Sequence, residues 1–116
     1  MIKLDCIFCR IVKREIPANI IFENEIVLGF SDIKPQAPVH ILVIPKKHIE
    51  RISDLTDKDA QLVNAMMLAM NAIADKFCIK ESGYRVIFNC NKDAGQEVFH
   101  IHAHLLGGRP MKWPPG

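Results

Sequence analysis

The feature that most constrains this chain is an alternation of histidines with apolar residues, His100-Ile101-His102-Ala103-His104-Leu105-Leu106. Successive side chains of a β-strand point to opposite faces, so a strand would place His100, His102 and His104 on one face and bury the apolar residues on the other. In a helix the three imidazoles would spread around the axis and no face would be cleanly apolar. The alternation therefore predicts a strand over Val98–Leu106.

The same geometry separates the roles of the three histidines. At a rise of roughly 3.3 Å per residue, His100 and His104 begin about 13 Å apart, whereas a zinc–nitrogen bond is only about 2 Å long. One metal ion could take two of these rings but hardly all three. We therefore expect the three histidines to do different jobs.

The other elements follow from apolar periodicity and turn residues. Helical spacing predicts a short helix in Cys6–Val12 and a long one at about 57–78, with Thr56 as its N-cap. Strands are predicted at Ile20–Glu23, Ile26–Phe30, Val39–Ile44 and Tyr84–Asn89, the first two as a hairpin, and a turn at Asn91–Gly95. This order predicts an α+β fold, in which helices cover one face of an antiparallel sheet.

Length and charge set broad limits on the protein. A chain of 116 residues is expected to form a single domain, residues 1–116. A net charge of +2 gives no argument for nucleic acid or a membrane surface as a partner, and no apolar run approaches the roughly 20 residues of a membrane span. The first residues lack the apolar core of a signal peptide, so a cytoplasmic location is expected. There, cysteines are expected to be thiols or metal ligands rather than disulfides.

Cys6-x-x-Cys9 is half of a tetrahedral zinc site. Two buried thiols and a redox pair are the alternatives, although a redox Cys-x-x-Cys normally lies between a strand and a helix. The further ligands of a zinc ion would come from His40, His48, the three alternating histidines, Cys78 and Cys90.

Nucleophilic catalysis is the second chemistry that the histidines indicate. A neutral imidazole is a good nucleophile near pH 7, and its attack on phosphorus would give a covalent phospho-histidine intermediate. The preceding segment, residues 91–97, contains Gly95, which lets backbone N–H groups approach a phosphate closely. Three histidines on one face beside a glycine turn favour a functional site over a structural one.

The tail Met111–Gly116 is stiffened by prolines and cannot continue a helix or a central strand. It carries Trp113, the only tryptophan. A large aromatic in such a tail must find a surface to pack on, either on its own domain or on a partner subunit.

The pattern His-φ-His-φ-His-φ-φ, in which φ is apolar, resembles the signature of the histidine triad (HIT) family of nucleotide hydrolases and transferases. The resemblance to its Hint branch covers almost the whole chain. It rests on Ile16-Pro17-Ala18, Phe30-Ser31-Asp32-Ile33, Pro35-Gln36-Ala37-Pro38-Val39-His40, Pro45-Lys46-Lys47-His48, Gly95-Gln96, Leu106-Gly107-Gly108-Arg109 and Trp113-Pro114-Pro115-Gly116.

The resemblance implies an α+β homodimer whose antiparallel sheet, about five strands per subunit, continues across the interface. It implies a purine nucleoside phosphoramidase, a hydrolase that splits the P–N bond of adenosine 5′-phosphoramidates or AMP–lysine conjugates and releases AMP. A dinucleoside polyphosphate hydrolase of a sister branch and a nucleotide-binding regulatory module are the alternatives.

Residue roles are carried over by position. His102 would be the nucleophile, with His104 and His40 on the phosphate oxygens and Asp32 on the ribose hydroxyls. The purine pocket would comprise Phe8, Phe30, Ile33 and Leu42, and the phosphate side would be lined by Asn89, Gly95, Gln96, Glu97 and Val98. Residues 109–116 would contact the partner subunit, and Trp113 would reach the nucleotide site of that subunit.

Two features depart from the best-known animal members. Position 97 is Glu rather than a Ser that can assist the departing amine. Relatives with the Cys-x-x-Cys pair bind zinc through residues that correspond here to Cys6, Cys9, His48 and His100. The resemblance thus implies one structural zinc ion per chain, which has no open position and cannot activate water.

Overall fold

A single antiparallel sheet with one long helix organises the protein. The computed structural model describes residue 3 and residues 5–116. The elements are α1 (Ile7–Val12), β1 (Ile20–Glu23), β2 (Val27–Ser31), β3 (Val39–Pro45), the 3-10 helices η1 (Ile52–Asp54) and η2 (Asp57–Asp59), α2 (Ala60–Lys76), β4 (Tyr84–Phe88), α3 (Asn91–Ala94) and β5 (Ala103–Gly107). The 5-stranded sheet has the order β1-β2-β3-β5-β4. The predicted α+β class is confirmed, with one long helix and a short N-terminal one.

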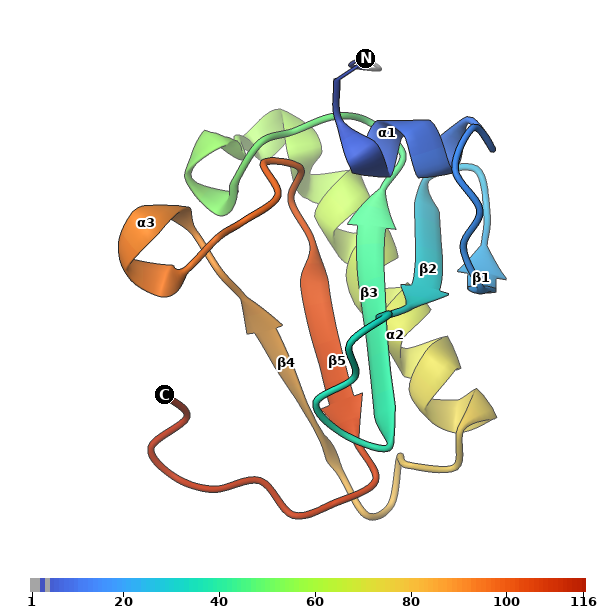
Figure 1. Ribbon diagram of the computed structural model, residues 1–116, viewed down its shortest axis with the longest axis vertical. Coiled ribbons are helices and arrows are strands. Elements are labelled where there is room, and N and C mark those ends of the chain that lie inside the picture. The colour runs from blue at the N-terminus through green and yellow to red at the C-terminus, as the bar shows by residue number, and fades with distance from the viewer. Residues whose placement is uncertain (1–2, 4) are drawn as a thin grey trace.

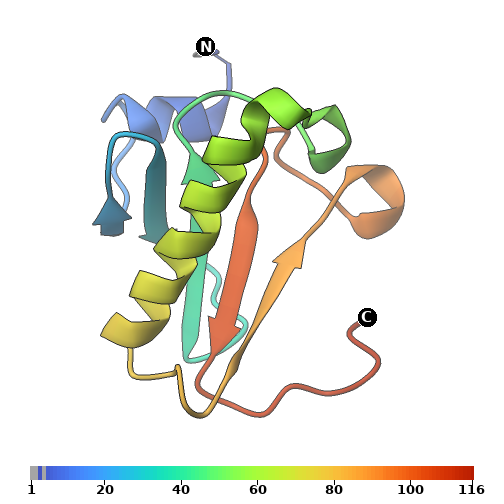
Figure 2. The ribbon, with the colours of Figure 1, turned by 180° about the vertical axis from the view of Figure 1, so that it is seen from behind.

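Alternation along the strands sends side chains into two separate layers. One face packs against α2, which runs across it in Figure 2; Ile41, Val43 and Leu105 lie in this core with Met70 and Ile73 of the helix. The other face is covered by α1 only at one end of the sheet, as Figure 1 shows. Its apolar part comprises Leu28, Phe30, Leu42 and Ile44, packed on Phe8, Cys9 and Ile11.

The long helix begins where a capping box predicts it. The side chain of Thr56 accepts from the N–H of Lys58, and the Asp59 carboxylate accepts from the N–H of Thr56 at 3.0 Å. The first turn is the 3-10 helix η2, so α2 starts at Ala60 rather than at 57. In the described part of the chain, no helix combines the length and the hydropathy needed to cross a membrane.

The histidine strand is shorter than the alternation predicts. The prediction of a strand over Val98–Leu106 is wrong at both ends, because β5 spans only Ala103–Gly107. Ala103 pairs with Val43 of β3 and with Phe88, the last residue of β4. Beyond these pairs β4 has ended, so His100 and His102 lie on the segment that leads into the sheet. The predicted turn at Asn91–Gly95 is the short helix α3, closed by Gly95 at φ 79°.

Two glycines let the end of β5 pass close to its neighbours. A Cβ on Gly107 would lie 2.6 Å from Cδ1 of Ile79. Gly108 has φ +89°, a conformation that favours glycine, and a Cβ there would lie 2.8 Å from Cβ of Pro38. The Gly-Gly pair therefore brings the chain after β5 against the loop of residues 32–38.

Candidate active site and metal centre

A backbone carbonyl determines which ring nitrogen of His102 carries the proton. Its Nδ1 lies 2.8 Å from the carbonyl oxygen of His100, and a carbonyl can only accept a hydrogen bond. Nδ1 therefore carries the proton and donates it. The other ring nitrogen, Nε2, is left with its lone pair, which is the form of imidazole that can attack an electrophile.

His40 and His104 are linked by a hydrogen bond, and this leaves His104 with its proton on Nε2, the nitrogen that carries the lone pair in His102. The backbone N–H of Gln36 donates to Nδ1 of His40 at 3.0 Å, so the proton of a neutral His40 is on Nε2. Nε2 of His40 lies 2.9 Å from Nδ1 of His104 and donates to it. His104 then keeps its own proton on Nε2. It can offer this N–H to an anionic oxygen.

Burial keeps these rings neutral near pH 7. It lowers the pKa of His104 to about 4, helped by the neighbouring His102 and His40 and opposed by Asp32. Burial also lowers the pKa of His102 and of His40 from the ordinary 6.5, although the Asp32 carboxylate acts in the opposite direction on both. The ring centroids of His102 and His104 are 5.1 Å apart. A nucleophile and a hydrogen-bond donor thus lie side by side.

The proposed base pocket is only partly assembled in the core. Phe8 packs edge-on against Phe30 at 5.5 Å and against His102 at 5.2 Å, and Leu42 belongs to the same cluster. Ile33 lies on the loop after β2 and is 93% exposed. The structure therefore places an aromatic and aliphatic wall directly beside His102, with an exposed aliphatic side chain on the neighbouring loop.

Gln96 has both polar groups of its side-chain amide engaged inside the protein. Its amide nitrogen donates to the carbonyls of Glu50 at 2.8 Å and Val98 at 3.1 Å, and its amide oxygen accepts from the N–H of Asn91 at 2.9 Å. Its backbone N–H donates to the Asn91 carbonyl at 3.0 Å. The side chain thus ties α3 to the segment that carries the histidines. A nucleotide contact by Gln96 stays a prediction.

The other residues expected on the phosphate side lie near Gln96 in sequence or beside α3 and α1. Asn89 directly follows β4, Gly95 caps α3, and Val98 packs at the edge of the α1 cluster. Glu97 is exposed and lines a cavity of about 270 Å³ together with Cys6 and His48. Their contacts with a nucleotide likewise stay predictions.

Four potential metal ligands converge next to the histidine site. Nδ1 of His100 lies 3.4 Å from Sγ of Cys6 and 3.5 Å from Sγ of Cys9. Nδ1 of His48 lies 3.3 Å from Sγ of Cys9 and 3.2 Å from Nδ1 of His100. Tetrahedral zinc with two sulfur and two nitrogen ligands has edges of about 3.3 to 3.8 Å. The cluster comes together from α1, the loop after β3 and the segment before β5.

Proton positions in this cluster suit a metal. Nε2 of His100 donates to the carbonyl of Pro45 at 2.8 Å, so Nδ1 presents its lone pair to the cluster. His100 is fully buried and burial lowers its pKa to about 4, which keeps it in the neutral form that binds metals. The residues present therefore fit a zinc ion.

Asp32, His40 and His104 also lie close together but do not fit a metal in the same way. Nε2 of His40 would be the ligand atom, and it carries the proton because Nδ1 accepts from Gln36. Asp32 approaches this N–H at 3.3 Å as a further acceptor. The group is a hydrogen-bond relay.

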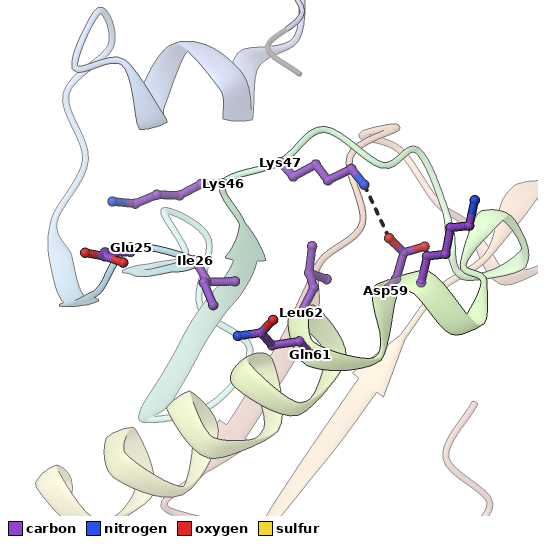
Figure 3. Close-up of a pocket in the computed structure, with 8 residues that line it drawn as sticks. Glu25, Ile26, Lys46, Lys47, Asp59, Gln61 and Leu62 are labelled. Carbon is purple, nitrogen blue, oxygen red and sulfur yellow. Dashed lines mark hydrogen bonds and ion pairs between the residues drawn. The ribbon is translucent and has the colours of Figure 1, made fainter.

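One cavity lies away from the histidines. It has a volume of about 310 Å³ and is formed by the β1–β2 turn, the residues after β3 and the start of α2 (Figure 3). Two of its three lysines are paired with carboxylates, Lys46 with Glu23 at 2.8 Å and Lys47 with Asp59 at 3.4 Å, and the third is Lys58.

Sequence reasoning did not find the backbone groups that set the proton positions. These are the Gln36 N–H, the Pro45 carbonyl and the His100 carbonyl. No residue type signals such a group, because every non-proline residue carries an N–H and every residue carries a carbonyl. Trp113, by contrast, is 83% exposed, so it does not pack on its own subunit.

The comparisons with known proteins agree on one family. The HIT domain family matches residues 13–111. The purine nucleoside phosphoramidase of Escherichia coli (strain K12) is 46% identical over 107 residues, which cover 92% of this chain and 90% of the relative.

Solved structures give the same result. The HIT family hydrolase of Legionella pneumophila superposes with a TM-score of 0.95 at 51% identity, covering 97% of this chain and 100% of that one. The histidine triad nucleotide-binding protein of Candida albicans superposes with a TM-score of 0.81 at 30% identity, covering 95% of this chain and 83% of that one.

Proposed function

The chain belongs to the HIT domain family, and from this membership we propose that it is a nucleotide hydrolase that cleaves the P–N bond of adenosine 5′-phosphoramidates or AMP–lysine-type conjugates and releases AMP. The E. coli relative named as a purine nucleoside phosphoramidase supports this choice of substrate. The observation that carries the proposal is the pair of opposite tautomers, a lone pair on Nε2 of His102 beside an N–H on Nε2 of His104.

The first chemical step is an attack by His102. Its Nε2 forms a bond to the α-phosphorus, the P–N bond breaks, and the amine leaves with a proton taken from the solvent. Nδ1 keeps its proton and continues to donate it to the His100 carbonyl, so the modified ring is stabilised as a cation. In the second step water attacks phosphorus and releases a proton to the solvent, Nε2 leaves as a neutral imidazole, and AMP is released.

Charge on the phosphoryl oxygens develops beside donors that are already oriented. The N–H on Nε2 of His104 points away from His40 and is available to one oxygen, and His40 holds His104 in this tautomer. Because Gln36, His40 and His104 donate in sequence, the donor does not have to be reorganised during the reaction.

The nucleotide would be held by the residues around this pair. Asp32 would accept from the ribose hydroxyls, and Phe8, Phe30, Ile33 and Leu42 would contact the purine. Asn89, Gly95, Gln96, Glu97 and Val98 would form the phosphate side. The packing of Phe8 against both Phe30 and His102 supports a base site next to the nucleophile.

A zinc ion would be held by Cys6, Cys9, His48 and His100, one per chain. With four protein ligands the ion would supply structural cross-linking, without an open position for water. We further propose a cytoplasmic location, whose reducing conditions would keep both thiols available as ligands.

A homodimer completes the proposal, with β4 as the strand that meets its counterpart. β4 is an edge strand, and such strands pair readily with another chain. An apolar cavity of about 180 Å³ lies beside it, lined by Ile52, Met67 and Phe88 among others. Residues 109–116 would then reach the partner subunit, as the exposure of Trp113 supports.

Turnover of an AMP–amine conjugate tests the reaction. The wild-type protein should release AMP, measured by chromatography, and His102→Ala should lower the rate at least about a thousandfold because the nucleophile is lost. Cys78→Ser, at an exposed cysteine outside both sites, is the matched control and should keep full activity. Full activity of a folded His102→Ala protein would reject the mechanism. Faster cleavage of a diadenosine polyphosphate than of the phosphoramidate would assign the protein to the sister activity.

A further inference from the structure

Arg109, directly after the Gly-Gly pair, holds the main chain of the loop that surrounds His40. Its Nη2 and Nε donate to the carbonyl oxygen of Gln36 at 2.9 and 3.2 Å, and its Nη1 donates to the carbonyl of Pro110 at 3.0 Å. All three nitrogens of the guanidinium therefore donate to the main chain.

Gln36 is also the residue whose N–H sets the tautomer of His40. Its N–H donates to Nδ1 of His40, and its carbonyl, on the other side of the Cα atom, accepts from Arg109. Pro35 precedes it and Pro38 follows it closely, which limits the backbone conformations of the segment. When the carbonyl is fixed, the N–H has little freedom left.

The other hydrogen bonds of this loop are local. Asp32 accepts from the N–H of Lys34 at 2.8 Å, and the side chain of Gln36 donates to the carbonyl of Lys34 at 3.1 Å. Arg109 reaches the loop from a position 73 residues away in sequence. The close approach of Gly108 to Pro38 brings the two segments into contact at the same place.

We propose that Arg109 is a positioning residue for the phosphate-binding histidines: it anchors Gln36 and so fixes the tautomers of His40 and His104. The chain of hydrogen bonds runs from Arg109 to the Gln36 carbonyl, from the Gln36 N–H to His40, and from His40 to His104. If the Gln36 N–H turned away, His40 could carry its proton on Nδ1. His104 would then have to donate from Nδ1, and its Nε2 would lose the N–H.

The structural part of this inference is tested by the tautomers themselves. Nitrogen-15 NMR of histidine-labelled protein identifies the protonated nitrogen of each ring without any substrate. The wild type should show Nε2–H for His40 and His104, and Arg109→Met should show a mixture of both tautomers for these two rings. Arg85→Met is the matched control. Arg85 donates to the carbonyl of Lys112 in the tail at 2.9 Å and makes no hydrogen bond to the loop, so its loss should leave all tautomers unchanged.

The catalytic part rests on the proposed function. With an AMP–amine conjugate, Arg109→Met should lower kcat about ten- to a hundredfold and change KM much less, because a donor is misdirected rather than a binding contact removed. Arg109→Lys keeps one donor for the Gln36 carbonyl and should recover part of both the tautomer ratio and kcat. This milder variant also decides the question if Arg109→Met does not fold.

The outcomes separate the two proposals. If the wild type fails to release AMP while Arg109→Met still mixes the tautomers, the proposed reaction is wrong and the positioning role stands. Wild-type tautomers in folded Arg109→Met would overturn the positioning role, whatever the activity. If Arg109→Met does not fold, the absence of any mixture in Arg109→Lys would overturn it, because a single donor in place of two should leave a partial mixture. An equal loss of tautomer order in Arg85→Met would also overturn it, since the effect would then come from the tail in general.

Discussion

The position of each imidazole proton in this site follows from a neighbour that can act in only one way. The His100 carbonyl can only accept, so His102 exposes a lone pair; the Gln36 N–H can only donate, so His104, through His40, exposes a proton. Two histidines that occupy equivalent places in the sequence pattern thus acquire opposite chemical roles.

The low pKa of His104 leads to a prediction about acid. Burial lowers its pKa to about 4, below the 6.5 of an exposed ring. Between these values the unfolded chain binds a proton that the folded chain does not, so the free energy of unfolding should fall as the pH is lowered from about 6.5 toward 4. In the same interval the folded enzyme keeps a neutral His104, so kcat/KM for an AMP–amine conjugate should persist below pH 6.5.

Urea unfolding and kcat/KM measured from pH 4 to 8 would check both statements. His104→Gln should show a smaller loss of stability over this interval, because the titrating group is gone. An acid limb of activity centred at or above pH 6.5, or the same pH dependence of stability in both proteins, would contradict the prediction.

At the scale of elements, much of the fold could be predicted from alternation and periodicity. The strands, the long helix and its Thr56 cap follow from local pattern, since each buries one face of a regular element. The length of β5 could not be predicted, because it depends on where β4 ends, far away in sequence. The residue types of the candidate site were readable from the motif and the family resemblance, whereas the relay through Gln36 depends on a loop conformation that no side-chain pattern encodes.

The cluster of Cys6, Cys9, His48 and His100 ties α1 to the loop after β3 and to the segment before β5, and a zinc ion there would make the protein sensitive to the loss of a ligand. Protein purified without added zinc should contain about one ion per chain by metal analysis. Cys9→Ser should lose most of the metal and melt more than about 5 °C lower, since even 1 kcal/mol shifts the melting temperature of a domain of this size by several degrees.

Cys78→Ser removes an exposed thiol outside the cluster and should change neither the metal content nor the melting temperature. Wild-type protein free of metal, or Cys9→Ser with an unchanged ion content, would rule out the proposed centre.

At the scale of the whole molecule, β4 forms one edge of the sheet, and no further strand pairs with it in the described part of the chain. Met67 is 45% exposed beside the apolar cavity at β4, and a stable dimer would bury it. Light scattering should give about twice the chain mass of 13.2 kDa. Met67→Glu would place a charge in the proposed interface and should shift the protein toward the monomer. Lys80→Glu also introduces a carboxylate, at an exposed site outside the apolar cavity, and should remain dimeric. A monomeric wild type would contradict the dimer.

The use of main-chain groups to orient the histidines has a consequence for how such a site can change over generations. The N–H of residue 36 and the carbonyls of residues 45 and 100 are present whatever side chains stand there. Position 36 can therefore accept most side chains without disturbing these hydrogen bonds. Proline is the main exception, because it has no N–H. The arrangement of protons is inherited with the course of the chain, and side-chain mutagenesis at position 36 would leave it largely untouched.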